Sequence, residues 1–225
     1  RHDVDNYSIF SLSGVSNSKT IFCNESGRYS IYQSDRYGFN NPDTEWDSNE
    51  IEYLLVGDSS TQGSCVNRPH DIGSVLRSLS NKAVLNLGYR GNGPLTEYAT
   101  LREYLSPKVK KVLWIYTGTD FLDLSAEINE EILMNYFTDT NYTQNLKSKQ
   151  KLLDNLAINL IEKNAKMEGE KIYPLLEFIK MYKLRTKLLT KPQTVVTKEF
   201  KEVLKLAKSL TSNNNSKLYL VYLPI

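Results

Sequence analysis

A serine at the end of an apolar run is the residue of this chain best suited to chemistry. Residues 54–64 read Leu-Leu-Val-Gly-Asp-Ser-Ser-Thr-Gln-Gly-Ser, which predicts a buried strand that ends near Gly57 and a helix that begins near Ser59. A serine at such a junction is exposed at the mouth of an α/β sheet, where the free amides of the helix favour negative charge. Ser59 is therefore a candidate nucleophile, although Asp and Ser at this position also suit a plain helix cap.

Two later segments repeat the pattern of an apolar strand that ends in small or polar residues. Residues 83–95 read Ala-Val-Leu-Asn-Leu-Gly-Tyr-Arg-Gly-Asn-Gly-Pro-Leu, a strand followed by a glycine-rich turn and a helix started by proline. Residues 111–124 read Lys-Val-Leu-Trp-Ile-Tyr-Thr-Gly-Thr-Asp-Phe-Leu-Asp-Leu, a third strand that ends at Gly118-Thr119-Asp120. Three strand ends thus supply candidate site residues.

In this order, the three segments resemble the motif blocks of the SGNH/GDSL hydrolase family. The resemblance implies that Ser59 is the nucleophile and that the amide of Gly91 belongs to the oxyanion hole. It also places Thr119 where the family has an asparagine whose amide is a further oxyanion donor. A threonine hydroxyl gives one shorter and less well aimed hydrogen bond, and the loss of one donor typically costs on the order of 100- to 1,000-fold in rate.

The family resemblance also assigns supporting roles. Gly57 and Asp58 are expected to brace the turn before the nucleophile, and Asp120 to fix the loop beside it. Two further segments resemble those of family members that add or remove acetyl groups on bacterial polysaccharides, including alginate acetyltransferase relatives. They are the stretch Ser34-Asp35-Arg36-Tyr37-Gly38-Phe39-Asn40 and the helix start at Gly93-Pro94. This implies acyl transfer through an ester on Ser59, with an O-acylated carbohydrate as substrate and with neither cofactor nor metal.

The last block of the family, Asp-x-x-His after the final strand, does not occur in this sequence. The chain ends at Leu220-Val221-Tyr222-Leu223-Pro224-Ile225, and we expect a fragment truncated before that block, with the general base beyond Ile225. Of the two histidines present, His2 lies in a polar, frayed terminal stretch, and His70 fits a solvated loop better than the role of base.

Two other functions remain open. The same fold with impaired chemistry would be a module that binds a glycan or a partner protein, which Thr119 and the missing last block favour. A flavodoxin-like domain that binds a nucleotide or phosphate is disfavoured, because the sequence contains neither a Gly-x-Gly-x-x-Gly turn nor a phosphate loop.

The elements predict a single α/β domain over residues 1–225, a flavodoxin-like three-layer parallel sheet with a helical insertion before the last strand. Residues 1–50 form a β-rich lead-in with a hairpin, and residues 125–210 form a helical insertion or cap over the cleft. The expected strands are 52–56, 83–87, 109–116 and 217–225, the expected hairpin strands are 20–23 and 28–32, and the expected helices are 72–79, 94–105, 125–137, 144–166, 172–189 and 197–210.

Charge is unevenly distributed along the chain. Residues 1–145 carry 12 basic and 19 acidic side chains, whereas residues 146–210 carry 15 and 7. Solvent-exposed helix faces explain the excess of basic residues in 146–210 best. The functional alternative is that these residues bind an anionic glycan or a membrane surface. No nucleic-acid-binding module is recognisable in the sequence.

The two cysteines are too few for a disulfide framework, and Cys65 is expected to be a small buried side chain. No run of about 20 apolar residues is present, so membrane association would require segments outside this sequence. We expect the full-length protein to be extracytoplasmic or tethered to a membrane.

Overall fold

The apolar runs of the sequence form one parallel sheet. The computed structural model describes residues 1–225 apart from 5–6, 25–26, 119, 171–196 and 225. Four strands lie in the order β6-β5-β7-β8, and every neighbouring pair is parallel. Their bounds are β5 Ile51–Val56, β6 Val84–Asn86, β7 Val109–Tyr116 and β8 Lys217–Tyr222. This is the flavodoxin-like strand order, so the predicted α/β class is confirmed.

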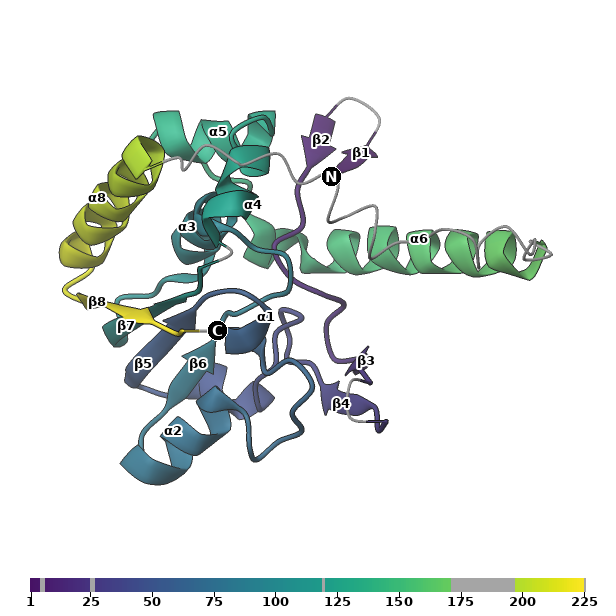
Figure 1. The fold of residues 1–225 in the computed structure, drawn as a ribbon, viewed down its shortest axis with the longest axis horizontal. Coiled ribbons are helices and arrows are strands. Elements are labelled where there is room, and N and C mark those ends of the chain that lie inside the picture. Colours follow the sequence, from purple (N-terminus) through teal and green to yellow (C-terminus); the bar gives the residue numbers. More distant parts are fainter. Residues whose placement is uncertain (5–6, 25–26, 119, 171–196, 225) are drawn as a thin grey trace.

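Alternate residues of the central strands enter two cores, as expected for a sheet covered on both faces. Leu54, Val56 and Trp114 are buried in the larger core, whereas Leu55 and Ile115 are buried in the smaller one. Figure 1 shows α2 (Ile72–Ser80) on one side of the sheet and α3 (Pro94–Tyr104) with α8 (Thr197–Asn213) on the other. The result is three layers.

The region predicted as one helix over 125–137 contains two helices, so that prediction is wrong. The first, α4 (Asp120–Glu127), ends before a turn at residues 128–130, and α5 (Glu131–Thr138) begins after it. The turn allows Leu124 of α4 and Leu133 of α5 both to enter the larger core.

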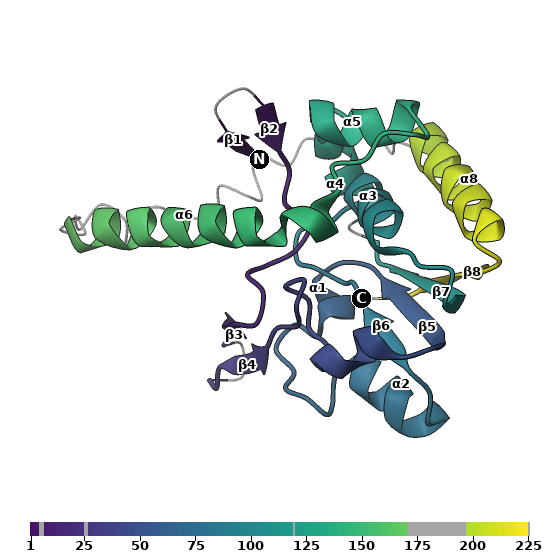
Figure 2. The ribbon, with the colours of Figure 1, turned by 180° about the vertical axis from the view of Figure 1, so that it is seen from behind.

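Beyond α5, the short 3-10 helix η2 (Leu146–Lys149) leads into α6 (Gln150–Glu170), which projects away from the sheet in Figures 1 and 2. The hydroxyl of Ser16 donates to Asp154 at 2.7 Å and attaches the first turns of α6 to the lead-in. The predicted helix 172–189 lies outside the described residues, so a cap over the cleft stays a prediction. No described helix combines the length and apolarity needed to cross a membrane.

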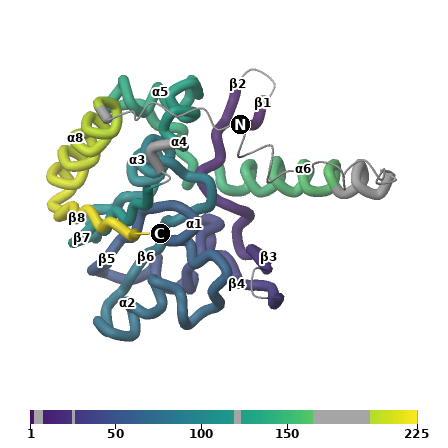
Figure 3. The backbone as a smooth tube through the Cα atoms, in the orientation of Figure 1, coloured from purple at the N-terminus to yellow at the C-terminus, as the bar shows by residue number. Residues whose placement is uncertain are grey.

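The lead-in forms two antiparallel hairpins and the 3-10 helix η1 (Asp43–Asp47). The hairpin of β3 (Lys19–Cys23) and β4 (Ser30–Gln33) agrees with the prediction. Strands β1 (His2–Val4) and β2 (Tyr7–Ile9) pair where a frayed terminus was expected, which corrects the placement of His2. The tube in Figure 3 shows the two hairpins on opposite sides of α6: β1–β2 lies above it and β3–β4 below it.

Candidate functional site

Ser59 is the first residue of α1 (Ser59–Gln62), at the carboxyl end of β5. The chain leaves β5 for β6 on one side of it and later returns to β7 on the other. The end of β5 is therefore the point where strand order reverses, which is where open α/β sheets bind their ligands. The Ser59 side chain is partly exposed, and no described residue hydrogen-bonds to its hydroxyl.

Asp58 and Gly57 shape the turn before Ser59. Asp58 is the N-cap of α1: its Oδ1 accepts from the amide of Ser60 at 2.8 Å, and its Oδ2 accepts from the hydroxyl of Thr117 at 3.5 Å. A Cβ on Gly57 would lie 2.1 Å from Oγ1 of Thr61 and 2.6 Å from the carbonyl oxygen of Ile115. Only glycine therefore permits this approach of α1 to β7.

The turn that contains Gly91 is attached to β5 and α1 by hydrogen bonds. The amide of Tyr89 donates to the carbonyl of Gly57 at 3.1 Å, and the amide of Arg90 donates to Oε1 of Gln62 at 2.8 Å. Gly91 itself has a φ of +76°, which favours glycine, and it is exposed. Within the described residues its N–H makes no hydrogen bond, so two unbonded groups, this N–H and the Ser59 hydroxyl, lie on segments held together.

The third predicted segment is only partly described. Gly118 follows β7 and is exposed, Thr119 lies outside the described residues, and Asp120 is the first residue of α4. Asp123, one turn further along α4, is near enough to Asp58 for the two charges to interact. Burial, and then the charge of Asp58, raise the pKa of Asp123.

Neither histidine supplies a base for Ser59 within the described part of the chain. His70 is exposed in the turn before α2, where its backbone amide donates to the carbonyl of Asn67 at 3.0 Å. His2 belongs to the β1–β2 hairpin. No hydrogen bond joins either imidazole to a described residue of the α1 region.

Buried carboxamides that sequence reasoning missed hold this edge together. Asn86 donates to the carbonyl of Thr61 at 2.6 Å, and its Oδ1 accepts from the amide of Gly88 at 2.9 Å. Asn41 donates to the carbonyl of Asn86 at 2.9 Å and to the fully buried Asp35 at 2.8 Å. Burial raises the pKa of Asp35, and hydrogen bonds such as that from Asn41 oppose the shift.

A second group of contacts joins the lead-in to the far end of α1. Asn40 donates to the carbonyl of Gln62 at 2.8 Å, and the Gln62 side chain donates to the hydroxyl of Tyr32 at 2.8 Å. Burial raises the pKa of Tyr32 to about 12, so this phenol stays neutral at physiological pH. The only sequence signal for these contacts between the lead-in and α1 was the stretch of residues 34–40.

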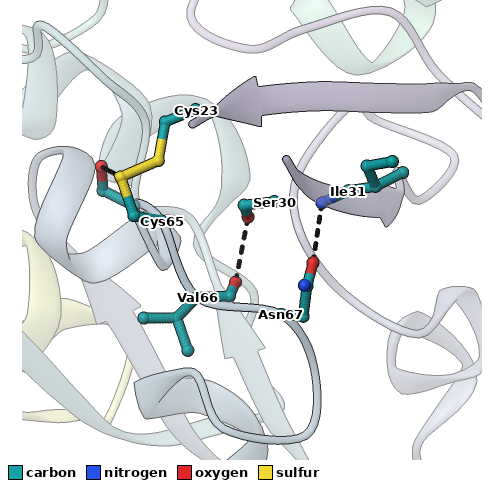
Figure 4. Close-up of a disulfide and its surroundings, with 7 residues drawn as sticks. Cys23, Ser30, Ile31, Cys65, Val66 and Asn67 are labelled. Carbon is teal, nitrogen blue, oxygen red and sulfur yellow. Dashed lines mark hydrogen bonds between the residues drawn. A yellow bond between two sulfur atoms is a disulfide. The ribbon is translucent and has the colours of Figure 1, made fainter. Parts of the chain in front are cut away.

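The two cysteines form a disulfide, and Cys65 is half-buried, which corrects the expectation that it is a small buried side chain. Cys23 at the end of β3 is bonded to Cys65 just after α1, with 5.2 Å between their Cα atoms (Figure 4). Beside it, the side chain of Asn67 accepts from the amide of Ile31 at 2.7 Å, and the hydroxyl of Ser30 donates to the carbonyl of Val66 at 3.2 Å. The β3–β4 hairpin is thus fixed against the loop that follows the Ser59 helix.

Together these features define an α/β protein of flavodoxin-like topology with a serine at the reversal point of its sheet. No protein-family model and no curated protein sequence matches the chain significantly. Among solved structures, it is similar to AlinE4, described as an SGNH-hydrolase family esterase, and to a point mutant of that esterase. In both comparisons the identity is 18%, the match covers 74% of this chain and 96% of the other, and the TM-score is 0.29. A likeness of this extent does not establish a family.

Proposed function

We propose that the protein is a serine hydrolase or acyltransferase of the SGNH type, with Ser59 as its nucleophile. The observation that supports the proposal is a pair of groups with no hydrogen bond to a described residue, the Ser59 hydroxyl and the N–H of Gly91, on two segments that are hydrogen-bonded to each other at the reversal point of the sheet. A hydroxyl on the first residue of a helix faces backbone amides that stabilise negative charge. This arrangement suits the attack of an oxygen nucleophile on an ester carbonyl.

The proposed reaction has two acyl-transfer steps. Oγ of Ser59 bonds to the carbonyl carbon while its proton passes to a general base, and the carbonyl electron pair moves to the oxygen. Collapse of this oxyanion expels the substrate alkoxide, which takes the proton and leaves an acyl ester on Ser59. Water or a sugar hydroxyl then attacks the ester and transfers its proton to the base, and as the second oxyanion collapses, Oγ of Ser59 leaves and takes that proton back.

The amides of Ser59 and Gly91 are the proposed oxyanion donors, and the proposed base is a histidine of an Asp-x-x-His segment after β8. Because β8 is parallel to β5, its carboxyl end lies at the same edge of the sheet as Ser59. A segment that follows β8 would therefore start on the side where the base is needed.

We propose an O-acylated carbohydrate, with acetyl as the acyl group, as the substrate. The support is the similarity of residues 34–40 and of the turn before Pro94 to members that modify polysaccharides. Residues 34–40 contain Asp35 and Asn40, which hold the second motif and α1 in place. Residues 34–40 therefore help to hold in place the edge of the sheet at which Ser59 lies.

Acetate release from an acetylated polysaccharide by the full-length protein tests the proposal. Ser59→Ala should abolish release, whereas Ser60→Ala, a change to the adjacent serine of the same helix, should leave most of it. A full-length protein that binds the polysaccharide and releases no acetate would favour the alternative, a glycan-binding module of the same fold.

A further inference from the structure

Asn92, in the turn that also contains Gly91, is a buried residue whose side-chain amide makes no hydrogen bond to the described part of the chain. It lies between Gly91 and Gly93, its side chain is only 5% exposed, and its Nδ2 is buried without a partner. No described residue hydrogen-bonds to its Oδ1 either. Buried polar groups in native proteins are almost always paired, so an unpaired one calls for an explanation.

The other buried asparagines of the same edge behave differently. Asn40, Asn41 and Asn86 each donate from Nδ2 to a backbone carbonyl, at 2.8, 2.9 and 2.6 Å respectively. These three side chains build the scaffold, and Asn92 contributes no contact to it. A purely structural role therefore does not explain why a carboxamide occupies position 92.

The backbone of Asn92 is fixed on both sides. Its amide donates to the carbonyl of Tyr89 at 3.3 Å, and the amide of Tyr89 in turn donates to Gly57, two residues before Ser59. The next residue, Gly93, donates to the buried carboxylate of Glu127 at 2.7 Å. The fixed backbone limits where the Asn92 side chain can lie, which favours stabilisation of a transition-state charge.

We propose that the side-chain amide of Asn92 donates a hydrogen bond to the oxyanion formed when Ser59 attacks its ester. This inference rests on the proposed function and deepens it. It supplies, from the turn after β6, the carboxamide donor that Thr119 does not offer. No described residue hydrogen-bonds to either end of the Asn92 carboxamide. Rotation about its last torsion can therefore exchange the nitrogen and oxygen, and so present the N–H to the oxyanion, without breaking a hydrogen bond to these residues.

The test measures p-nitrophenyl acetate hydrolysis by the full-length protein and by its Ser59→Ala, Asn92→Ala and Asn92→Asp variants. We expect Asn92→Ala to lower kcat about 100- to 1,000-fold with little change in KM, as for other oxyanion donors. Asn92→Asp, which lacks the N–H donor and adds negative charge, should be at least as slow.

Thermal unfolding separates this role from a structural one. Asn92→Ala removes an unpaired polar group, so its Tm should equal or exceed that of the wild type. If Ser59→Ala is inactive while Asn92→Ala stays within about threefold of the wild-type kcat, the assignment of Asn92 is wrong and the proposed function stands. Hydrolysis that survives Ser59→Ala, or a wild-type protein without hydrolysis, would overturn both.

Discussion

The side-chain amide of Asn86 lies 2.6 Å from the carbonyl oxygen of Thr61 and donates a hydrogen bond to it. This bond joins the end of β6 to α1, the helix that begins with Ser59. Its position in the second predicted motif shows what that motif does physically. Asn86 holds α1 in place, while the residues that follow it form the glycine turn.

Asn86→Ala should therefore weaken both the fold and the site. The carbonyl of Thr61 loses its donor and the amide of Gly88 loses its acceptor, and both are buried. Two such losses cost about 2–4 kcal/mol of unfolding free energy, measured by urea denaturation. Asn141→Ala, at an exposed loop position, is the control and should change stability by less than about 0.5 kcal/mol. Equal effects of the two substitutions would contradict the role of Asn86.

The disulfide should contribute strongly to stability, because it closes a loop between residues 42 positions apart. Loop-closure entropy for this length corresponds to about 4 kcal/mol. We expect reductant to lower the Tm of the wild type and to leave unchanged the Tm of a variant with Cys23→Ala and Cys65→Ala. A wild-type Tm that does not respond to reductant, under conditions where free thiols are detected, would contradict this prediction.

The burial of Asp123 and the nearby charge of Asp58 predict that the free energy of unfolding depends on pH through Asp123. Burial, then the Asp58 charge, raise the pKa of Asp123 above the ordinary value of 3.8. The folded protein therefore binds this proton more tightly than the unfolded chain does. The contribution is complete below the unfolded pKa and is lost as the pH rises through the folded pKa.

Asp123→Asn cannot ionise and should escape this loss. The Tm of the variant minus that of the wild type should therefore increase between about pH 3.5 and about pH 7. Differential scanning calorimetry at both pH values measures the difference, in which contributions shared by the two proteins cancel. A difference that stays constant or falls over this range would show that the pKa of Asp123 is not raised.

The sequence predicted the sheet well because its strands are continuous apolar runs. Both faces of β5 and β7 are covered, so residues such as Leu54 and Leu55 are both buried, and the run is visible without any alignment. The β1–β2 hairpin was missed because its strands are short and polar. The break between α4 and α5 was missed because neither glycine nor proline marks residues 128–130.

Only those residues of the candidate site that stand in short sequence motifs could be predicted. Ser59 and Gly91 stand in short motifs at strand ends, which a single sequence shows. The contacts that hold them connect distant residues: Asn41 with Asn86, Asn40 with Gln62, and Cys23 with Cys65. Pairings of this kind depend on the folded topology, so neither residue type nor local spacing reveals them.

The measurement that tests the central claim most directly is the site of covalent modification by a fluorophosphonate ester, which traps activated serine nucleophiles. The full-length protein is treated with the probe, and its adduct is located by peptide mass spectrometry. The account predicts one adduct, on Ser59, that is lost in Ser59→Ala, retained in Ser60→Ala and slowed in Asn92→Ala. An unmodified protein, or an adduct on another serine, would contradict the assignment of Ser59 as the nucleophile.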